Sequence, residues 1–550
     1  MRTWFKSGAP WIWLNASAVS VSLIMVAGLL GLIAARGLGH FWPADIAELE
    51  YRQADGQTVR MIGEIREQED VPRERLVSAG MTVPEGVETI RRVQLKVGNR
   101  DVTGLDFTWI LGSDIQSERY PEALVVIERR EWGNFYGYVR EVHEAGATVA
   151  SGAQAWDALN VRLQRAADLF EQIRTIERGE IGAINYALEQ LRLDTRRLEL
   201  DGRATPEAMA AIAAQRAELQ AKYETLQKTL VGLYADIRRD SVSVEIQDGR
   251  VVELPLEKVV HVLQPNAMGI GTKLKTYMDK VWEFMSDEPR EANTEGGIFP
   301  AIFGTVLMVI LMSILVTPFG VIAALYLREY AKQGPITRII RIAVNNLAGV
   351  PAIVYGVFGL GFFVYFLGGN IDQLFYAEAL PAPTFGTPGL MWASLTLAIL
   401  TVPVVIVATE EGLARIPSAI REGSLALGAT KAETLWRTIM PMASPAMMTG
   451  LILAVARAAG EVAPLMLVGV VKLAPTLPLD GNAPFLHLDR KFMHLGFHIY
   501  DVGFQSPNVE AARPLVYATA LLLVLVIVAL NLAAISIRNH LREKYRALDQ

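Results

Sequence analysis

The sequence predicts a polytopic α-helical membrane protein with about six transmembrane helices and an inserted α+β extracytoplasmic domain. Of its 550 residues, 51% are hydrophobic and 20% are charged, which is too apolar for a soluble protein and too charged for a purely membrane-embedded one. Charge-free runs long enough to cross a bilayer recur along the chain. Between the first two runs, residues 40–297 have the composition of a soluble domain.

The first charge-free run, residues 16–35, follows Arg2 and Lys6 and is longer than the apolar core of a signal peptide. We therefore expect residues 1–39 to form an uncleaved transmembrane anchor, although Ala34-Ala35 would also suit a cleavage site. In either case the residues after the anchor are exported. The N-terminus is then cytoplasmic and residues 40–297 are extracytoplasmic.

The extracytoplasmic domain begins with β-rich segments such as residues 93–97 and 123–128. Residues 155–237 predict a long antiparallel helical hairpin with a turn at 201–206. Apolar residues recur on one face of each arm: Ile184, Leu188, Leu191 and Leu198 in the first, and Leu219, Tyr223, Leu226, Leu230, Leu233 and Ile237 in the second. The hairpin is either a docking arm or a spacer that packs only on itself. We expect deletion of residues 156–237 to preserve folding, because the two ends should lie close together.

A β-hairpin at 241–254 and an amphipathic helix at 273–285 are predicted to lead into the membrane region, residues 298–550. The charge-free runs of that region are 298–327, 342–371, 379–409, 438–456 and 514–537. Cationic residues of the short loops set the orientation. They cluster after the second span (Arg328, Lys332, Arg338, Arg341) and in the tail (Arg538, Arg542, Lys544, Arg546), so both are predicted to be cytoplasmic. Four cationic residues in the loop between the fifth and sixth spans argue against this orientation: Lys472, Arg490, Lys491 and Arg513. We give more weight to the even number of spans, which puts the N-terminus on the same side of the membrane as the tail.

Residues 421–467 join a charged surface segment to a span that carries an arginine. We expect one helix to end near Leu427, a turn at Gly428, and a second helix that begins at Thr430. Glu433, three positions after Thr430, completes a capping box. The segment is therefore predicted to be a surface helix-turn-helix.

The spacing of this segment resembles the EAA loop of ATP-binding-cassette (ABC) importer permeases, in which Gly and Pro follow Glu-Ala-Ala at fixed distances. Here Glu422, Gly423 and Ser424 stand for the triplet, Gly428 follows Glu422 by six residues, and Pro441 follows Gly428 by thirteen. Gly423 and Ser424 depart from Ala-Ala, but both are small, so close packing of this helix against a partner is retained.

Three further stretches resemble the phosphate-specific PstA type of that family: 324–330 (ALYLREY), 345–356 (NNLAGVPAIVYG) and 454–467 (AVARAAGEVAPLML). The resemblance implies a permease subunit of an ATP-driven phosphate importer in a bacterial inner membrane. It also implies several partners: a cytoplasmic ABC ATPase dimer, a second permease chain of the PstC type, an extracytoplasmic phosphate-binding protein and membrane lipid.

Arg457 is the residue of the membrane region that most strongly indicates a specific role. A guanidinium within a membrane span is unfavourable in free energy unless it is paired or faces a polar cavity. Glu461 lies one helical turn later. The spacing alone fits equally an anion site and an ion pair that locks two helices. The resemblance favours the anion site, because the matching arginine of the family lines the phosphate path. Some relatives carry a second arginine where Val407 and Ala408 stand here.

Asn345, Asn346, Gly349, Pro351 and Tyr355 place amides, a helix breaker and a phenol within one apolar run. Backbone groups freed by the proline must be satisfied within the protein, so this segment should face protein or a cavity. A simple kink is the alternative. We expect Asn346 and Tyr355 to share the substrate path with Arg457.

No catalytic residue or cofactor is expected. The stretch Gly269–Lys273 lacks the Walker A pattern, so ATP hydrolysis must come from another chain. No metal site is expected either: only His494 and His498 stand four residues apart, and ordinary loop histidines are favoured over metal ligands. Nucleic acid is not an expected partner. The alternatives are a membrane-anchored sensor or scaffold with a ligand-binding external domain, and a secondary transporter, which the absence of a visible sequence repeat disfavours.

Overall fold

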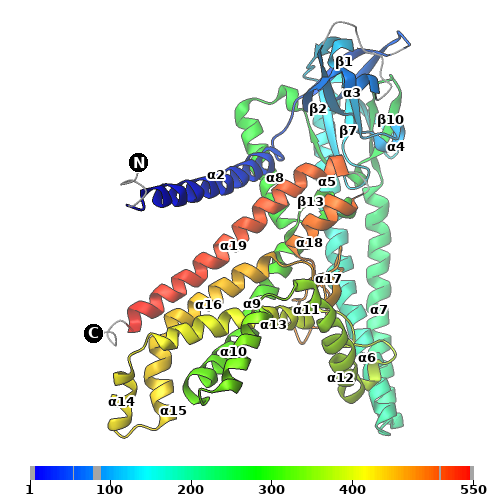
Figure 1. Ribbon diagram of the computed structural model, residues 1–550. Helices are drawn as coiled ribbons and strands as arrows, with labels where there is room; N and C mark the ends of the chain where they lie inside the picture. The colour runs from blue at the N-terminus through cyan, green and yellow to red at the C-terminus, as the bar shows by residue number, and fades with distance from the viewer. Residues whose placement is uncertain (1–6, 54, 79–87, 507–508, 546–550) are drawn as a thin grey trace. The chain divides into compact units, whose positions relative to one another are not determined.

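The computed structural model describes residues 7–53, 55–78, 88–506 and 509–545 (Figure 1). Residues 41–297 form one compact unit, and the helices before and after it belong to a second unit. Arg2, Lys6 and Arg546, which contribute to the predicted orientation, lie outside the described residues.

The described part of residues 41–297 contains two antiparallel sheets of five and six strands and a two-stranded ribbon, β12 (Pro289–Arg290) with β13 (Glu295–Gly296). The five-stranded sheet has the order β4-β3-β2-β1-β5, with β1 Ile46–Arg52, β2 Thr58–Pro72, β3 Thr89–Lys96, β4 Phe107–Leu111 and β5 Ile115–Arg119. The larger sheet has the order β10-β9-β7-β6-β11, with β8 paired to β7. Its strands are β6 Leu124–Arg129, β7 Phe135–Glu144, β8 Ala147–Ser151, β9 Asp240–Glu245, β10 Val251–Pro255 and β11 Val259–Leu263. The predicted β9–β10 hairpin is confirmed, with Ser243 opposite Glu253.

The helices of this unit are α3 Arg73–Ser78, α4 Arg100–Thr103, α5 Ala155–Arg174, α6 Gly182–Leu200, α7 Pro206–Ile237 and α8 Ile270–Ser286. A π-helical turn, Thr175–Ile181, joins α5 to α6. Thr205 caps α7, because its hydroxyl accepts a hydrogen bond from the Ala208 amide at 3.3 Å. The apolar residues predicted on the inner faces of α6 and α7 are buried or half-buried, so the helical hairpin forms as the periodicity indicates.

The expectation that residues 156–237 can be deleted as a unit is wrong. Leu159 and Ile173 of α5 are buried in one hydrophobic cluster with Val125, Val142 and Val244 of the larger sheet. Helix α5 therefore covers the core of this unit, and only the distal part of the hairpin is free of it. The sequence periodicity did not show this, because a sheet-covering helix and a free hairpin arm carry the same apolar spacing.

Removal of the distal hairpin alone, residues 184–222 with the two arms rejoined, is expected to leave the fold of the unit intact. By contrast, Leu159→Ala should destabilise the unit by about 2–5 kcal/mol, because it opens a cavity at a fully buried position. Thermal unfolding of the full chain in detergent measures both effects. A distal deletion that unfolds the unit would show that the hairpin tip also supports the core.

The helices of the second unit are α2 Ala9–Gly39, α9 Phe299–Leu325, α10 Pro335–Leu347, α11 Ala352–Phe358, α12 Gly369–Phe375, α13 Leu390–Ala414, α14 Ser418–Ala426, α15 Lys431–Thr434, α16 Met440–Gly460, α17 Leu465–Val468, α18 Leu495–Tyr500 and α19 Val509–Tyr545. Among the described residues, six helical stretches are long and apolar enough to cross a membrane: 9–39, 299–330, 352–375, 390–414, 431–460 and 512–543. The predicted number of spans is confirmed.

Two of the predicted spans begin later than their charge-free runs. The third span starts at Ala352, because the chain breaks at Gly349–Pro351 and residues 335–347 form the separate helix α10. The fourth span starts at Leu390 and not at Ala379. Residues 381–389 contain three prolines and two glycines, which cannot sustain a helix although none of them is charged.

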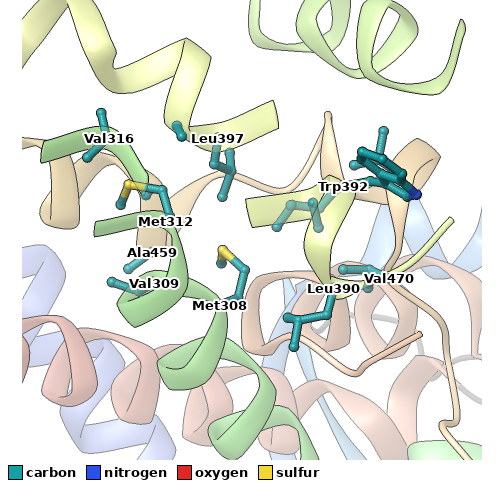
Figure 2. Close-up of a cluster of buried hydrophobic side chains, with 14 of the residues drawn as sticks. Met308, Val309, Met312, Val316, Leu390, Trp392, Leu397, Ala459 and Val470 are labelled. Carbon is teal, nitrogen blue, oxygen red and sulfur yellow. The ribbon is translucent and has the colours of Figure 1, made fainter. Parts of the chain in front are cut away.

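Helix α13 packs against both α9 and α16 (Figure 1). The core between them is apolar, and Figure 2 shows Ala459 of α16 near Met308, Val309 and Met312 of α9. A small residue on α16 allows this helix to lie close to α13: a Cβ added at Gly450 would lie 2.8 Å from the Cβ of Ala408 in α13. This packing fixes the end of α16, where Arg457 lies.

Candidate functional site

The helix-turn-helix predicted from Glu422 to Pro441 is confirmed as a hairpin of α14 and α15 (Figure 1). Gly428 makes the turn in a left-handed conformation, with φ of 87°. Its amide donates to the Leu425 carbonyl at 3.0 Å, and the Ala429 amide donates to the Ser424 carbonyl at 3.3 Å. These two bonds form a Schellman motif. The Thr430 hydroxyl accepts from the Glu433 amide and the Glu433 carboxylate accepts from the Thr430 amide, so both ends of the break are satisfied.

One face of the α14–α15 hairpin is buried and the other is exposed. Leu435 and Ile439, in the π-helical turn that joins α15 to α16, are buried in a cluster with Leu413 and Ile416. On the outer face, apolar side chains reach solvent: Leu425 is 47%, Leu427 is 91% and Trp436 is 66% exposed. Glu422 and Gly423 are exposed as well, and a Cβ at Gly423 would meet no atom within 4 Å. The hairpin thus presents an open, partly apolar surface.

The hairpin is braced by the end of the second span, in the stretch 324–330. The Arg421 guanidinium donates to the Glu329 carboxylate at 2.9 Å and to the carbonyls of Leu413 and Ile416 at 2.8 and 2.6 Å. The Lys431 ammonium lies 4.6 Å from the ring centroid of Tyr330. Sequence reasoning singled out this stretch by resemblance but assigned Glu329 no role, because its partner lies 92 positions away.

Arg457 lies in the last turn of α16, and Glu461 is the residue at which that helix ends. The sequence predicts both residues on one face of a continuous helix. In the structure the helix ends before Glu461, because the backbone at Glu461 is already extended. Their side chains still meet: Nε of Arg457 lies 3.4 Å from Oε1 of Glu461. Among the described residues, no other hydrogen bond or ion pair involves this guanidinium. Its two terminal amino groups are therefore open to a ligand, and the side chain is 31% exposed.

Tyr355 and Asn346 lie on either side of the break in the chain before α11. The Tyr355 side chain is buried, and its hydroxyl donates to the Leu347 carbonyl at 2.6 Å, which satisfies a backbone group freed by Pro351. The positive charge of Arg457 acts on this phenol, so the structure brings Tyr355 into the neighbourhood of the arginine. The Asn346 side chain is exposed, and no contact connects it to Arg457.

A second polar feature lies at the end of α13, where a pocket of about 290 Å³ is lined by Arg341, Asn345, Val407, Glu410 and others. Arg341 of α10 donates to the Glu410 carboxylate, with a closest distance of 2.6 Å. Two guanidinium groups line this pocket, those of Arg328 and Arg341, whereas Val407 contributes an apolar side chain. Sequence reasoning missed the Arg341–Glu410 pair because its members come from different helices.

The histidines of the loop after α16 have structural contacts. His487 lies 2.9 Å from the Asp480 carboxylate, and Nδ1 of His494 accepts from the Gly496 amide at 3.1 Å, which caps α18. Burial lowers the pKa of both His494 and His498 to about 4, so neither carries a charge near neutral pH. Among the described residues, no group of three or more His, Asp or Glu side chains is placed to hold a metal ion.

The structure has three features of a membrane permease subunit. These are six candidate spans, an exposed helical hairpin between two of them, and an open guanidinium on a spanning helix. Residues 316–547 match the family described as "Binding-protein-dependent transport system inner membrane component". The chain is a permease subunit of an ABC importer and not itself an enzyme.

Individual relatives identify the type of permease within this family. It is 35% identical over 244 residues to the phosphate transport system permease protein PstA 1 of Mycobacterium tuberculosis, covering 44% of this chain and 71% of the relative. It is 30% identical over 241 residues to a probable PstA permease of Methanocaldococcus jannaschii, covering 43% of this chain and 74% of the relative. The chain belongs to the family of PstA-type phosphate transport system permeases.

Similarity extends to a PstC permease of Mesorhizobium japonicum, with 30% identity over 190 residues that cover 33% of this chain and 58% of the relative. Among solved structures, the inward-facing MetNI methionine ABC transporter aligns with 44% of this chain and 94% of its own, at 17% identity and a TM-score of 0.31.

Proposed function

We propose that this protein is a phosphate-translocating permease subunit whose Arg457 contacts the anion in the membrane path. The observation that carries the proposal is the open guanidinium of Arg457, which lies in a candidate membrane span. The residues that the structure describes give it a single long polar contact, 3.4 Å to Glu461. A planar fork of donors suits phosphate oxygens. Glu461 prevents the empty site from holding an unpaired cation, and the nearby Tyr355 supplies a rigid wall. Asn346 is proposed only as a more distant part of the path.

The α14–α15 hairpin is proposed to dock on a cytoplasmic ATPase. Its surface supports this, because it exposes the apolar Leu425, Leu427 and Trp436 together with the small Gly423 and the carboxylate of Glu422. In this proposal, Ser424 holds the two helices of the hairpin together, since its hydroxyl lies 2.9 Å from that of Thr434. Pro441 lies just after the π-helical turn Leu435–Ile439, within the continuous helical stretch 431–460.

The proposed partners are an ATPase dimer, a second permease of the PstC type and a phosphate-binding protein on the outer side. We propose that the termini and the α14–α15 hairpin lie in the cytoplasm and that residues 40–297 lie outside. Two of the cations that argue against this orientation are neutralised. Lys472 lies 3.1 Å from the Asp501 carboxylate and Arg490 lies 2.6 Å from that of Asp480.

The test is transport. The chain is co-expressed with its candidate ATPase and second permease, reconstituted in proteoliposomes and supplied with the binding protein. We expect phosphate uptake that requires ATP. Uptake of another substrate in place of phosphate would contradict the proposed substrate. A chain that purifies without any ATPase and supports no uptake would contradict the transport function and favour the membrane-anchored sensor.

The brace between Arg421 and Glu329 gives a further prediction. Glu329→Ala should lower substrate-stimulated ATP hydrolysis severalfold while the chain still inserts, because the lost charged hydrogen bonds, worth about 1.5–3 kcal/mol each, hold the hairpin in position. ATPase assays on the reconstituted complex measure the effect. Glu411→Ala, which removes an exposed carboxylate near the end of α13, serves as the control. Equal activities of the two variants would show that the brace is unimportant.

A further inference from the structure

A pocket of about 340 Å³ lies at the base of the helical hairpin in residues 41–297. Its floor is apolar and includes Phe170 and Ile173 of α5. Cationic side chains reach it from four segments: Arg130 after β6, Arg174 and Arg178 at the α5–α6 junction, Lys258 before β11, and Arg290 after α8. No step of the proposed transport function uses this pocket.

Arg130 has the most unusual environment of these cations. Its guanidinium carbon lies 3.2 Å from the ring centroid of Phe170, and its Nε donates to the Glu257 carbonyl at 3.1 Å. No carboxylate among the described residues lies within ion-pair distance. Burial and the neighbouring charges of Arg290 and Arg174 lower the pKa of Arg130 to about 10, against a weaker opposite effect of Glu171. Arg130 thus lies near two other arginines, Arg174 and Arg290, and has no carboxylate of its own in ion-pair contact among the described residues.

The carboxylates that also line the pocket are largely engaged elsewhere. Glu288 accepts from both Arg174 and Arg178, and Glu257 accepts from Arg238. Glu177 accepts from the Tyr234 hydroxyl. Of the remaining two, Asp287 accepts from Ser286, and Glu131 is exposed. Arg290 lies 3.0 Å from the Glu283 carboxylate. Arg130 and Lys258 are therefore the pocket cations for which the described part of the chain supplies no carboxylate partner.

The backbone supplies an independent observation. Glu177 and Arg178 lie in the π-helical turn Thr175–Ile181, which interrupts the long helix at the pocket. Such turns re-aim side chains and occur frequently at functional sites. The turn directs Arg178 to Glu288, which also accepts from Arg174. Arg174 lies 3.8 Å from Glu171 as well, and its positive charge acts on Arg130.

We propose that this pocket binds a small oxyanion, coordinated by Arg130 and Lys258 over the apolar floor. Two or more N–H donors of a guanidinium match the oxygens of such an anion. Inorganic phosphate is the probe of choice because of the proposed function, whereas the oxyanion chemistry rests on the pocket itself. Residues 287–290, which line the pocket, belong to the segment between α8 and the second span. Occupancy would hold that segment against α5.

Hydrogen–deuterium exchange of the full chain in lipid-free detergent tests the proposal, with phosphate compared with chloride at equal ionic strength. We expect phosphate to slow exchange in peptides that cover 170–178, 256–259 and 286–291. Arg130→Gln should weaken the phosphate midpoint by about tenfold or more, as expected for a lost charged hydrogen bond. Arg250→Gln, which removes an exposed arginine paired with Asp248 in the β9–β10 turn, should leave it unchanged.

Absence of local slowing with phosphate, or the same midpoint in Arg130→Gln, would overturn the proposal. Lys258 is exposed, so Lys258→Gln provides a second variant that should fold normally and weaken binding severalfold; an unchanged midpoint there would also count against it. Arg457→Gln should retain the slowing in these peptides. The inference and the proposed transport function can therefore fail separately.

Discussion

Replacing Arg457 with lysine is expected to reduce phosphate uptake by about ten- to a hundredfold, because the charge remains while the planar fork of donors is lost. Arg457→Gln should be at least as harmful, since it removes both. The geometry supports this expectation: in the described ranges of the chain, only Nε of the guanidinium has a hydrogen-bond partner, Glu461, at 3.4 Å. Uptake into proteoliposomes at matched protein content measures the effect. Arg542→Gln, an exposed arginine near the end of α19, is the control.

The double variant Arg457→Gln with Glu461→Gln separates an anion contact from a structural ion pair. If the pair only locks the end of α16, removal of both charges leaves nothing unpaired, and transport should recover. If Arg457 binds the anion, the double variant should remain as impaired as Arg457→Gln alone. Normal transport by the double variant would overturn the anion site and leave this helix with a packing role.

Features that depend on neighbours in the sequence could be predicted well. The Thr430–Glu433 capping box, the turn at Gly428 and the number of spans follow from local rules of capping and hydrophobic length. The inner faces of α6 and α7 follow from the helical period in the same way. Each of these features requires only residues within one or two turns of one another.

Features that depend on packing could not be predicted. Whether α5 covers a sheet or belongs to a free arm is decided by residues in β6, β7 and β9. The partners of Arg421 and Arg341 come from other helices, so spacing gave no sign of them. Charge-free length also set two spans too early, because proline and glycine end a helix without adding charge. Glu461 leaves the helix for a similar reason: Pro464 follows three positions later.

The second large effect is expected at Gly428. Its φ of 87° lies in the left-handed region, which proline cannot adopt because its ring fixes φ near −65°. Proline also removes the amide that donates to the Leu425 carbonyl. Gly428→Pro should therefore break the Schellman motif and separate α14 from α15, and substrate-stimulated ATP hydrolysis should be abolished while membrane insertion is intact.

A graded series at Gly428 shows whether the turn conformation is the cause. Asparagine tolerates the left-handed region better than alanine, whose cost there is about 1–2 kcal/mol, so stimulation should fall in the order Gly, Asn, Ala, Pro. Gly423→Ala is the matched control, because its added Cβ meets no atom within 4 Å in this chain and alanine is the residue of the EAA pattern. Unchanged stimulation in Gly428→Pro would exclude a coupling role for the hairpin. Equal losses in Gly423→Ala and Gly428→Ala would point to crowding at the docked surface and not to the turn.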